Sequence, residues 1–190
     1  MFPRRFFKKL KRGPQVVLGK DAGAVLAYSG LSSGDVVLEA GAGSGFAAII
    51  WGNAVRPKGK VYSFERREDF ADLAQKNVEK AGLEKVVKIV RKEAFQGQRS
   101  KADLVFLDCG DSNLLIAEAF EHLKPGGLLV GYLPHVEQLR GFVECAVNAG
   151  FELELCLENN EREWLVRERG SLPVNTGLTH TAFLAFLRKP

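Results

Sequence analysis

The stretch VVLEAGAGSGFAA, residues 36–48, begins with a run of apolar, β-favouring residues. Glycines then occupy every second position, at Gly41, Gly43 and Gly45. In an open α/β sheet, ligands bind beyond the carboxyl ends of the strands, most often at the first turn from strand to helix. Gly41 and Gly43 permit a tight turn that lets a ligand lie against bare backbone, and Gly45 lets the next helix approach the sheet. The stretch therefore predicts a strand, a ligand-binding turn and a helix.

The rest of the chain alternates short apolar runs with amphipathic segments. Helices are expected over 44–55, 67–82, 112–124 and 135–150. Strands are expected over 35–40, 60–65, 86–93, 102–108, 128–134, 151–158 and 180–189, with a polar connection containing EREWLVRERGSLP between the last two. Such alternation predicts right-handed βαβ units and an α/β fold whose mostly parallel sheet has helices on both faces.

Composition limits the class of protein. With 190 residues, 46% of them hydrophobic, the chain is long enough for one well-buried core, so a single domain is expected. It has no apolar run of about 18 residues and no signal-peptide pattern, which favours a cytoplasmic protein. Cys109, Cys145 and Cys156 form no CxxC pair, so buried reduced thiols are expected rather than zinc or redox chemistry.

The net charge of +4 is concentrated at the N-terminus. The first 20 residues contain seven Lys or Arg and no acid, so the other 170 carry 20 basic and 23 acidic residues. Residues 1–12 therefore form a basic, Phe-containing arm on a nearly neutral body. Such an arm suggests an anionic partner, either nucleic-acid phosphate or a membrane surface. A solvated, frayed terminus is the other interpretation.

Two acids accompany the glycine turn. Glu39 lies inside an apolar strand end, where an unpaired carboxylate is costly, so it is expected to face an amine or backbone donors. Glu65 ends the second strand, 20 residues after Gly45, where a carboxylate can accept hydrogen bonds from both hydroxyls of a ribose. The glycines alone also suit a dinucleotide or an ordinary tight turn, but the spacing to Glu65 favours a nucleoside.

With an acid two residues before GAGSG, the motif EAGAGSG resembles the first motif of the class I S-adenosylmethionine-dependent methyltransferases; dinucleotide enzymes usually have GxGxxG instead. The resemblance implies S-adenosylmethionine as cofactor and a Rossmann-like seven-stranded sheet whose final strand is antiparallel. It also implies that residues 41–45, including Ser44, hold the methionine part, that Glu65 holds the ribose, and that Glu93 with Ala94 approaches the adenine amine.

Further segments resemble one branch of that family, the tRNA adenine N1-methyltransferases that modify the T-loop. These are RGPQ followed by KDA, then LKPGGLLVGYLP, EREWLVR and GLTHTAFLAF. The resemblance runs from about Arg12 to the C-terminus, which makes residues 13–190 the methyltransferase domain. It implies that Gln15 lies in a segment that closes over the cofactor, that the substrate is the T-loop adenosine of tRNA (adenine 58), and that the protein is a homotetramer.

The sequence departs from that branch in three places. Members usually carry an N-terminal β-rich domain, whereas only the arm precedes the resemblance here, and they more often have Asp where Glu93 stands. After the fourth strand they have prolines and an aromatic, whereas this chain reads DCGDSN, residues 108–113. The leading acid, Asp108, is kept.

Methyl transfer to adenine N1 requires in-line alignment and exclusion of water. Asp108 can accept a hydrogen bond from the exocyclic amine, which would orient the base and offset the charge that develops on it. The extruded base also needs a stacking partner. Because DCGDSN has no aromatic, the candidates are Phe2, Phe6, Phe7 and Trp164.

Other polar residues have structural interpretations. Asp111 or Ser112 can cap a helix, and Cys109 is expected to be a small buried residue rather than a nucleophile. His180 can be a hydrogen-bonded structural residue or part of the active site. No metal is expected, since His122 and His135 lack ligand spacing. Arg162 and Arg167, which flank Trp164, can meet phosphate or lie in a solvated loop.

Two alternative functions remain open from the sequence. One is a methyltransferase of the same fold that acts on a small molecule or a protein carboxylate. The other is a cofactor-binding but non-catalytic RNA-binding subunit. The intact glycines and Glu65 count against the second alternative.

Overall fold

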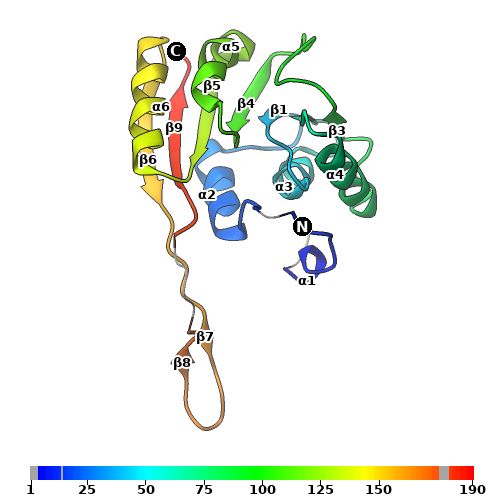
Figure 1. Ribbon diagram of the computed structural model, residues 1–190, viewed down its shortest axis with the longest axis vertical. Helices are drawn as coiled ribbons and strands as arrows, with labels where there is room; N and C mark the ends of the chain where they lie inside the picture. The colour runs from blue at the N-terminus through cyan, green and yellow to red at the C-terminus, as the bar shows by residue number, and fades with distance from the viewer. Residues whose placement is uncertain (1–3, 14, 176–179) are drawn as a thin grey trace.

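The computed structural model describes residues 4–13, 15–175 and 180–190 and contains one large sheet flanked by helices (Figure 1). Its seven strands lie in the order β3-β2-β1-β4-β5-β9-β6, and β9 is antiparallel to both of its neighbours while the other pairs are parallel. The strands are β1 Val36–Ala40, β2 Lys60–Phe64, β3 Val87–Val90, β4 Ala102–Leu107, β5 Leu123–Leu133, β6 Glu152–Glu158 and β9 Phe183–Arg188. The seven-stranded, mostly parallel sheet with an antiparallel last strand is confirmed.

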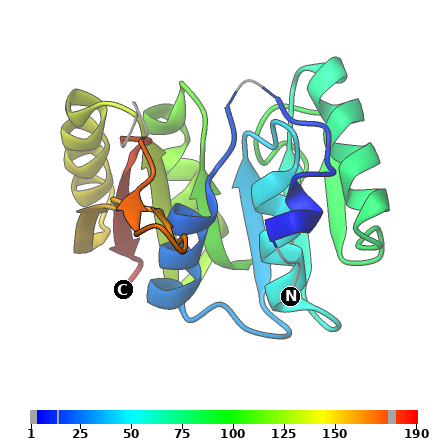
Figure 2. The same cartoon turned by 90° about the horizontal axis from the view of Figure 1, so that it is seen from below.

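Helices cover both faces of the sheet, as predicted (Figure 2). Because side chains alternate along a strand, successive residues of β1 enter two different cores. Val37 packs with Phe106 in the core beneath α2, α3 and α4, whereas Leu38 packs with Val105 in the core beneath α5 and α6. The helices are α2 Gly19–Ser29, α3 Phe46–Val55, α4 Glu68–Lys80, α5 Ile116–His122 and α6 Val136–Asn148.

Part of the N-terminal arm packs on the body of the protein. A short helix, α1 Arg4–Phe7, is followed by Leu10, which is only 7% exposed and belongs to the core beneath α3. Phe7 packs against Phe46 of α3, with ring centroids 5.4 Å apart. The frayed-terminus interpretation is therefore wrong for this described part of the arm, while Phe2 lies outside the described residues.

Besides α1, two elements were not expected from the alternation of strands and helices. The segment containing KDA forms α2, which ends at Gly30 in a left-handed conformation. The polar connection between the last two strands forms a small antiparallel hairpin, with β7 Trp164–Leu165 paired to β8 Leu172–Pro173. Figure 1 shows this hairpin projecting far from the sheet, which leaves Trp164 59% exposed.

Several local predictions are corrected. The expected helix over 112–124 begins as a 3-10 turn, Ser112–Leu115, and neither Asp111 nor Ser112 caps it with its side chain. The strand expected from Leu128 begins at Leu123 instead, with an irregularity of register opposite β4. Two thiols expected to be buried, Cys145 and Cys156, are exposed, and Cys109 is half-buried.

No helix among the described residues is long and apolar enough to span a membrane.

Candidate functional site

The glycine turn connects β1 to α3 and is fastened to the end of β2. The backbone N–H groups of Gly41 and Ala42 both donate to the carbonyl of Phe64, each at 3.0 Å. A side-chain Cβ at Gly41 would lie 2.0 Å from the backbone oxygen of Asp108, so this glycine allows β1 and β4 to meet. At Gly41 the space that a side chain would occupy is therefore filled by protein, and the predicted contact of its backbone with a ligand stays a prediction.

The next two glycines have different surroundings. A Cβ at Gly43 would meet no protein atom within 4 Å, so the backbone there is open to a ligand. A Cβ at Gly45 would lie 3.2 Å from Ala74 of α4, so this glycine permits close contact between α3 and α4. All three glycines have positive φ, at 96°, 52° and 77° along the chain, a conformation that costs other residues free energy.

Glu65 closes the turn from the end of β2. One carboxylate oxygen, Oε2, accepts a hydrogen bond from the Gly43 N–H at 3.0 Å. The other, Oε1, accepts from the backbone N–H of Arg67 at 3.1 Å and from its Nε at 3.3 Å. Since each carboxylate oxygen has two lone pairs, Oε2 keeps one for a ligand and Oε1 is full. Glu65 can thus accept one ribose hydroxyl directly, and a second if the Arg67 guanidinium moves.

Glu39 is buried at 1% exposure in the last part of β1. Its carboxyl oxygens, the Ser63 hydroxyl and the Trp51 indole N–H are buried without a hydrogen-bond partner among the described residues. Desolvation, reinforced by the charges of Asp108 and Glu65, raises the pKa of Glu39 to about 8, although Ser63 and Trp51 oppose the shift. The Ser63 hydroxyl and the Trp51 indole N–H are therefore the donors that face this carboxyl, although neither makes a well-formed hydrogen bond to it; the amine or backbone donors expected for Glu39 stay a prediction.

Asp108 follows β4 and lies beside the end of β1, where its backbone N–H donates to the Ala40 carbonyl at 2.9 Å. Its half-buried position and the nearby charge of Glu65 raise the pKa of Asp108 to about 7. The carboxyl groups of Glu39, Glu65 and Asp108 therefore influence one another at the carboxyl ends of β1, β2 and β4. Such a cluster of acids favours a ligand that carries positive charge.

The segment before α2 lies against the glycine turn. Asn77 of α4, which is fully buried, donates from Nδ2 to the carbonyls of Lys11 at 2.8 Å and Ser44 at 2.9 Å. Gln15 is exposed a few residues beyond Lys11, and the Ser44 hydroxyl is buried without a partner in the described chain. The sequence analysis missed the part played by Asn77, whose signal is an amide on the apolar face of a helix.

The residues predicted to approach adenine are less enclosed. The Glu93 side chain is 70% exposed and lies 3.9 Å from the Arg66 guanidinium, which also bonds Asp111 at 3.3 Å. Ala94 is half-buried. The structure therefore does not bring Glu93 into the buried acidic cluster. It shows instead that Arg66, which the sequence analysis also missed, bridges the loops after β3 and β4.

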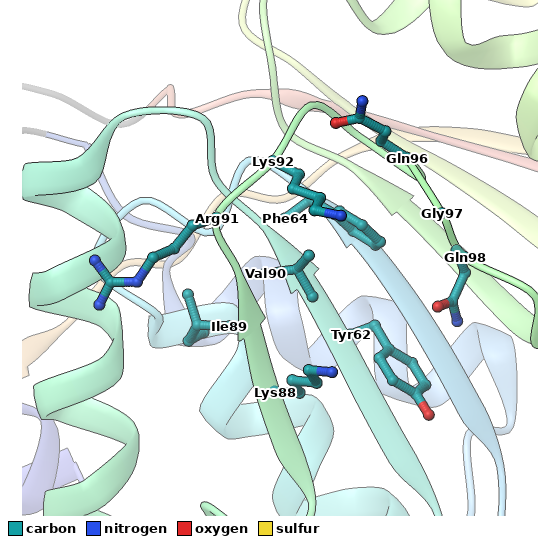
Figure 3. Close-up of a pocket in the computed structure, with 10 residues that line it drawn as sticks. All are labelled: Tyr62, Phe64, Lys88, Ile89, Val90, Arg91, Lys92, Gln96, Gly97 and Gln98. Carbon is teal, nitrogen blue, oxygen red and sulfur yellow. The ribbon is translucent and has the colours of Figure 1, made fainter.

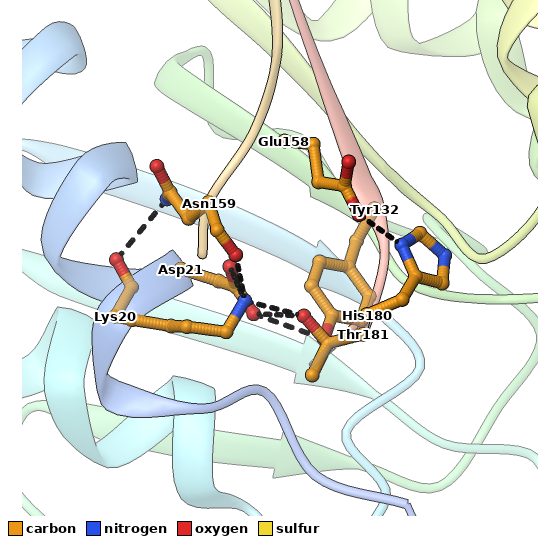
Figure 4. A network of polar contacts seen from close by, with 7 residues as sticks. All are labelled: Lys20, Asp21, Tyr132, Glu158, Asn159, His180 and Thr181. Atoms are coloured by element: carbon orange, nitrogen blue, oxygen red, sulfur yellow. Dashed lines mark hydrogen bonds and ion pairs between the residues drawn. The ribbon is translucent and has the colours of Figure 1, made fainter. Parts of the chain in front are cut away.

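A polar network beside Asp108 joins distant parts of the chain (Figure 4). The buried Asp21 accepts hydrogen bonds from Lys20 at 2.7 Å, Thr181 at 2.8 Å and the Tyr132 hydroxyl at 3.3 Å. Lys20 also donates to the Asn159 carbonyl at 2.7 Å and to the Thr181 hydroxyl at 2.6 Å. Burial, followed by the charges of Asp21 and Asp108, raises the pKa of Tyr132, so this aromatic side chain lies within electrostatic reach of Asp108.

The histidines have structural surroundings. His180 contacts Glu158 at 2.5 Å and the Pro134 carbonyl at 2.9 Å, and these two partners raise its pKa (Figure 4). His122 packs against the ring of Phe95, and His135 begins α6 with a capping box. No group of three potential metal ligands occurs among the described residues.

Comparison with known proteins gives a consistent result. Residues 2–182 match the family described as "tRNA methyltransferase complex GCD14 subunit". The tRNA (adenine(57)-N(1)/adenine(58)-N(1))-methyltransferase TrmI of Methanocaldococcus jannaschii is 31% identical over 210 residues, which is 96% of this chain and 74% of that protein.

Two solved structures share the fold over nearly the whole chain. A SAM-dependent O-methyltransferase from Thermotoga maritima has a TM-score of 0.89 at 30% identity and covers 98% of this chain and 71% of its own. The tRNA (m1A58) methyltransferase TrmI from Aquifex aeolicus has a TM-score of 0.86 at 26% identity, and the match covers 97% of this chain and 74% of that chain.

Proposed function

The chain belongs to the family of the tRNA methyltransferase complex GCD14 subunit, and from that premise we propose that it methylates N1 of the T-loop adenosine (adenine 58) of tRNA. The observation that carries the proposal is the 31% identity, over 96% of this chain, to an archaeal TrmI named for that reaction. The domain that performs it comprises residues 13–190, with residues 1–12 as a basic arm.

The residues at the glycine turn fit S-adenosylmethionine. The open backbone at Gly43 can accept the methionine part, assisted by Gly41, Ser44 and Gly45. The free lone pair of Glu65 suits a ribose hydroxyl, and we propose that Glu39, buried at the end of β1, lies nearest the amino group of the methionine part. We further propose that Gln15 closes over the cofactor and that Glu93 and Ala94 border its adenine. When bound, the cofactor supplies a methyl group on a positively charged sulfur, a strong electrophile.

Asp108 is the proposed catalytic residue. Its carboxylate accepts a hydrogen bond from the exocyclic amine of the target adenine, so that N1 faces the methyl group. As N1 is alkylated the base becomes positively charged, and the nearby carboxylate stabilises this charge. Because the pKa of Asp108 is about 7, the carboxylate is only partly ionised at neutral pH in the free protein, and neighbouring positive charge increases the ionised fraction.

Tyr132 is the proposed aromatic neighbour of the extruded base. Phe7 is engaged with Phe46, and Trp164 lies on the projecting hairpin. Tyr132 is half-buried with its ring centroid 6.3 Å from that of Phe106, its hydroxyl is held by Asp21, and it lies within electrostatic reach of Asp108. An orientation fixed by that bond would present a preorganised ring to the base.

We also propose a homotetramer in the cytoplasm that contacts tRNA phosphate through the arm. Support for the arm comes from its charge: Arg5, Lys8, Lys9, Lys11 and Arg12 precede the cofactor segment without an intervening acid.

A second candidate function is supported by the Thermotoga maritima structure, which is named an O-methyltransferase. The absence of aromatic and proline residues from DCGDSN is compatible with a carboxylate or small-molecule acceptor. This candidate predicts methyl transfer without RNA.

The deciding experiment incubates the protein with methyl-labelled S-adenosylmethionine and unmodified tRNA transcript, followed by nucleoside mass spectrometry. We expect 1-methyladenosine from the wild type, its loss in Asp108→Ala, and its retention in Asp69→Ala, a matched change at an exposed acid of α4. A transcript with adenine 58 replaced should remain unlabelled. Cofactor binding without label in tRNA would contradict the proposal.

A further inference from the structure

A pocket of about 370 Å³ lies on the outer part of the sheet, where β2 and β3 meet the loop after β3 (Figure 3). Strand β3 is at the edge of the sheet. The connection at residues 91–101, all of them described, contains no helix, so a loop at residues 96–98 covers this face in place of one. None of the residues proposed to bind the cofactor lines the pocket.

The pocket presents hydrogen-bond donors and positive charge. Figure 3 shows the amines of Lys88, on β3, and of Lys92, in the loop after it, directed toward the side on which Tyr62 and Gln98 lie. Neither amine has an ion pair or hydrogen bond within the described chain. Arg91 points to the opposite side, where it pairs with Asp72 of α4 at 2.5 Å. The two lysines therefore keep their charge free for a ligand.

Gln98 provides an independent indication. Its side-chain Nε2 is buried and has no hydrogen-bond partner among the described residues. Buried polar groups nearly always have a partner, so this unpaired amide N–H beside the pocket fits an acceptor that comes from a ligand or from water. No Asp or Glu is among the residues that line the pocket in the described structure, so no carboxylate of the protein repels an anion there.

Lysines on an edge strand also serve to prevent pairing with other chains. That role explains charge at Lys88 but not the concave surface or the unpaired Gln98 amide. The nearest acid in sequence, Glu93, is engaged with Arg66 and does not line the pocket. A small anion with several acceptor oxygens accounts for the charge, the shape and the amide together.

We propose that this pocket binds a phosphate group, with Lys88 and Lys92 as counter-charges and the Gln98 amide as a hydrogen-bond donor. Phosphate oxygens accept from amines and amides alike, and such contacts are charge-assisted. The phosphate comes either from an RNA backbone or from a free phosphate compound. The RNA source rests on the proposed function and would extend the tRNA contact surface to the β3 edge of the sheet.

The first test measures tRNA affinity over a range of salt concentrations. For the double variant Lys88→Ala/Lys92→Ala we expect the affinity for tRNA to be about tenfold lower. The slope of log K against the logarithm of the salt concentration should be less steep by about 1. The matched control Lys76→Ala/Lys80→Ala removes the same charge from the exposed face of α4 and should change affinity less than threefold. Gln98→Glu should reproduce the loss with both lysines intact. Unchanged affinity for S-adenosylmethionine verifies that each variant is folded.

The second test titrates inorganic phosphate and AMP into the same variants by calorimetry. A loss of tRNA affinity in the pocket variants identifies the RNA backbone as the source. Loss of phosphate or AMP binding with unchanged tRNA affinity identifies a free phosphate compound. If the pocket variants bind tRNA, inorganic phosphate and AMP as tightly as the wild type does, the proposed phosphate site is wrong. The phosphate titration does not depend on methyl transfer. Its result therefore tests the pocket even if the protein does not methylate tRNA.

Discussion

The carboxylate of Glu65 accepts a hydrogen bond from the backbone N–H of Gly43 at 3.0 Å, which joins the end of β2 to the most open point of the glycine turn. One side chain thus both shapes the turn and offers its remaining lone pair to a ligand. Neighbouring strands supply the two parts, so the site exists only when β1 and β2 are paired in register.

Glu65→Ala should weaken S-adenosylmethionine binding at least tenfold, because it removes a charged acceptor and frees the turn. Calorimetric titration measures this. Arg67→Ala is the informative comparison. It removes the hydrogen bond from Arg67 Nε to Glu65 Oε1, which is 3.3 Å long, and keeps the Glu65 carboxylate. We expect its affinity to be equal to or higher than that of the wild type; a loss as large as in Glu65→Ala would assign cofactor binding to the arginine.

Asp108→Asn should lower kcat by about 100-fold or more and leave cofactor affinity nearly unchanged, because the amide keeps the shape but not the charge. Since the pKa of Asp108 is about 7, kcat/KM of the wild type should rise as pH increases through 7. The variant should lack this rise. A pH profile of the same form in both proteins would exclude Asp108 as the titrating group.

Glu39→Gln tests the buried acid through stability. Its pKa is about 8 in the folded protein and near 4.5 when unfolded, so the folded state binds the extra proton and stability falls as pH rises between these values. The variant should match the wild type near pH 4.5. At pH 8 its free energy of unfolding should be higher by about 2–4 kcal/mol, as measured with urea.

Asp108 contributes to the same pH dependence, because its pKa is raised as well. Glu39→Gln should therefore flatten the stability profile only in part. Parallel profiles for the wild type and Glu39→Gln would show that Glu39 does not carry a proton in the folded protein.

Two glycine substitutions separate folding from binding. Gly41→Ala places a Cβ 2.0 Å from the Asp108 carbonyl, so we expect a loss of at least about 3 kcal/mol in unfolding free energy. Gly43→Ala meets no protein atom within 4 Å and should cost only about 1 kcal/mol, for its positive φ. Thermal melts should show this contrast.

Only the second substitution tests the ligand directly. Gly43→Ala should reduce S-adenosylmethionine affinity at least tenfold while remaining folded. If it binds the cofactor normally, the open backbone at Gly43 is not where the ligand lies.

Much of the sheet was predictable because its signals are local. The apolar runs that form β1 and β4 and the glycines that end β1 are contiguous in sequence. The helix α2 was missed because it has no side-chain cap and presents only Ala22 and Val25, with Asp21, as its buried residues. The hairpin was missed because each of its strands is two residues long.

The kind of site was easier to predict from the sequence than the surroundings of each side chain in it. Glu65 can be found from its spacing to the glycines, and the structure places it beside Gly43. The surroundings of Glu39 depend on Ser63 and Trp51, which other elements bring near it. The exposure of Glu93 likewise depends on the loop that carries it. The role of Gly41 likewise depends on Asp108, which is distant in sequence but adjacent across the sheet.

The position of β9 has a consequence for biosynthesis. This strand, Phe183–Arg188, lies between β5 and β6, although it is made after both. As the chain leaves the ribosome, β5 presents an unpaired edge and β6 has no partner until residues 183–188 emerge. The half of the sheet containing β1, β2 and β3 can form earlier from nearby segments. Late insertion of β9 between β5 and the edge strand β6 therefore makes the nascent chain prone to aggregation through β5.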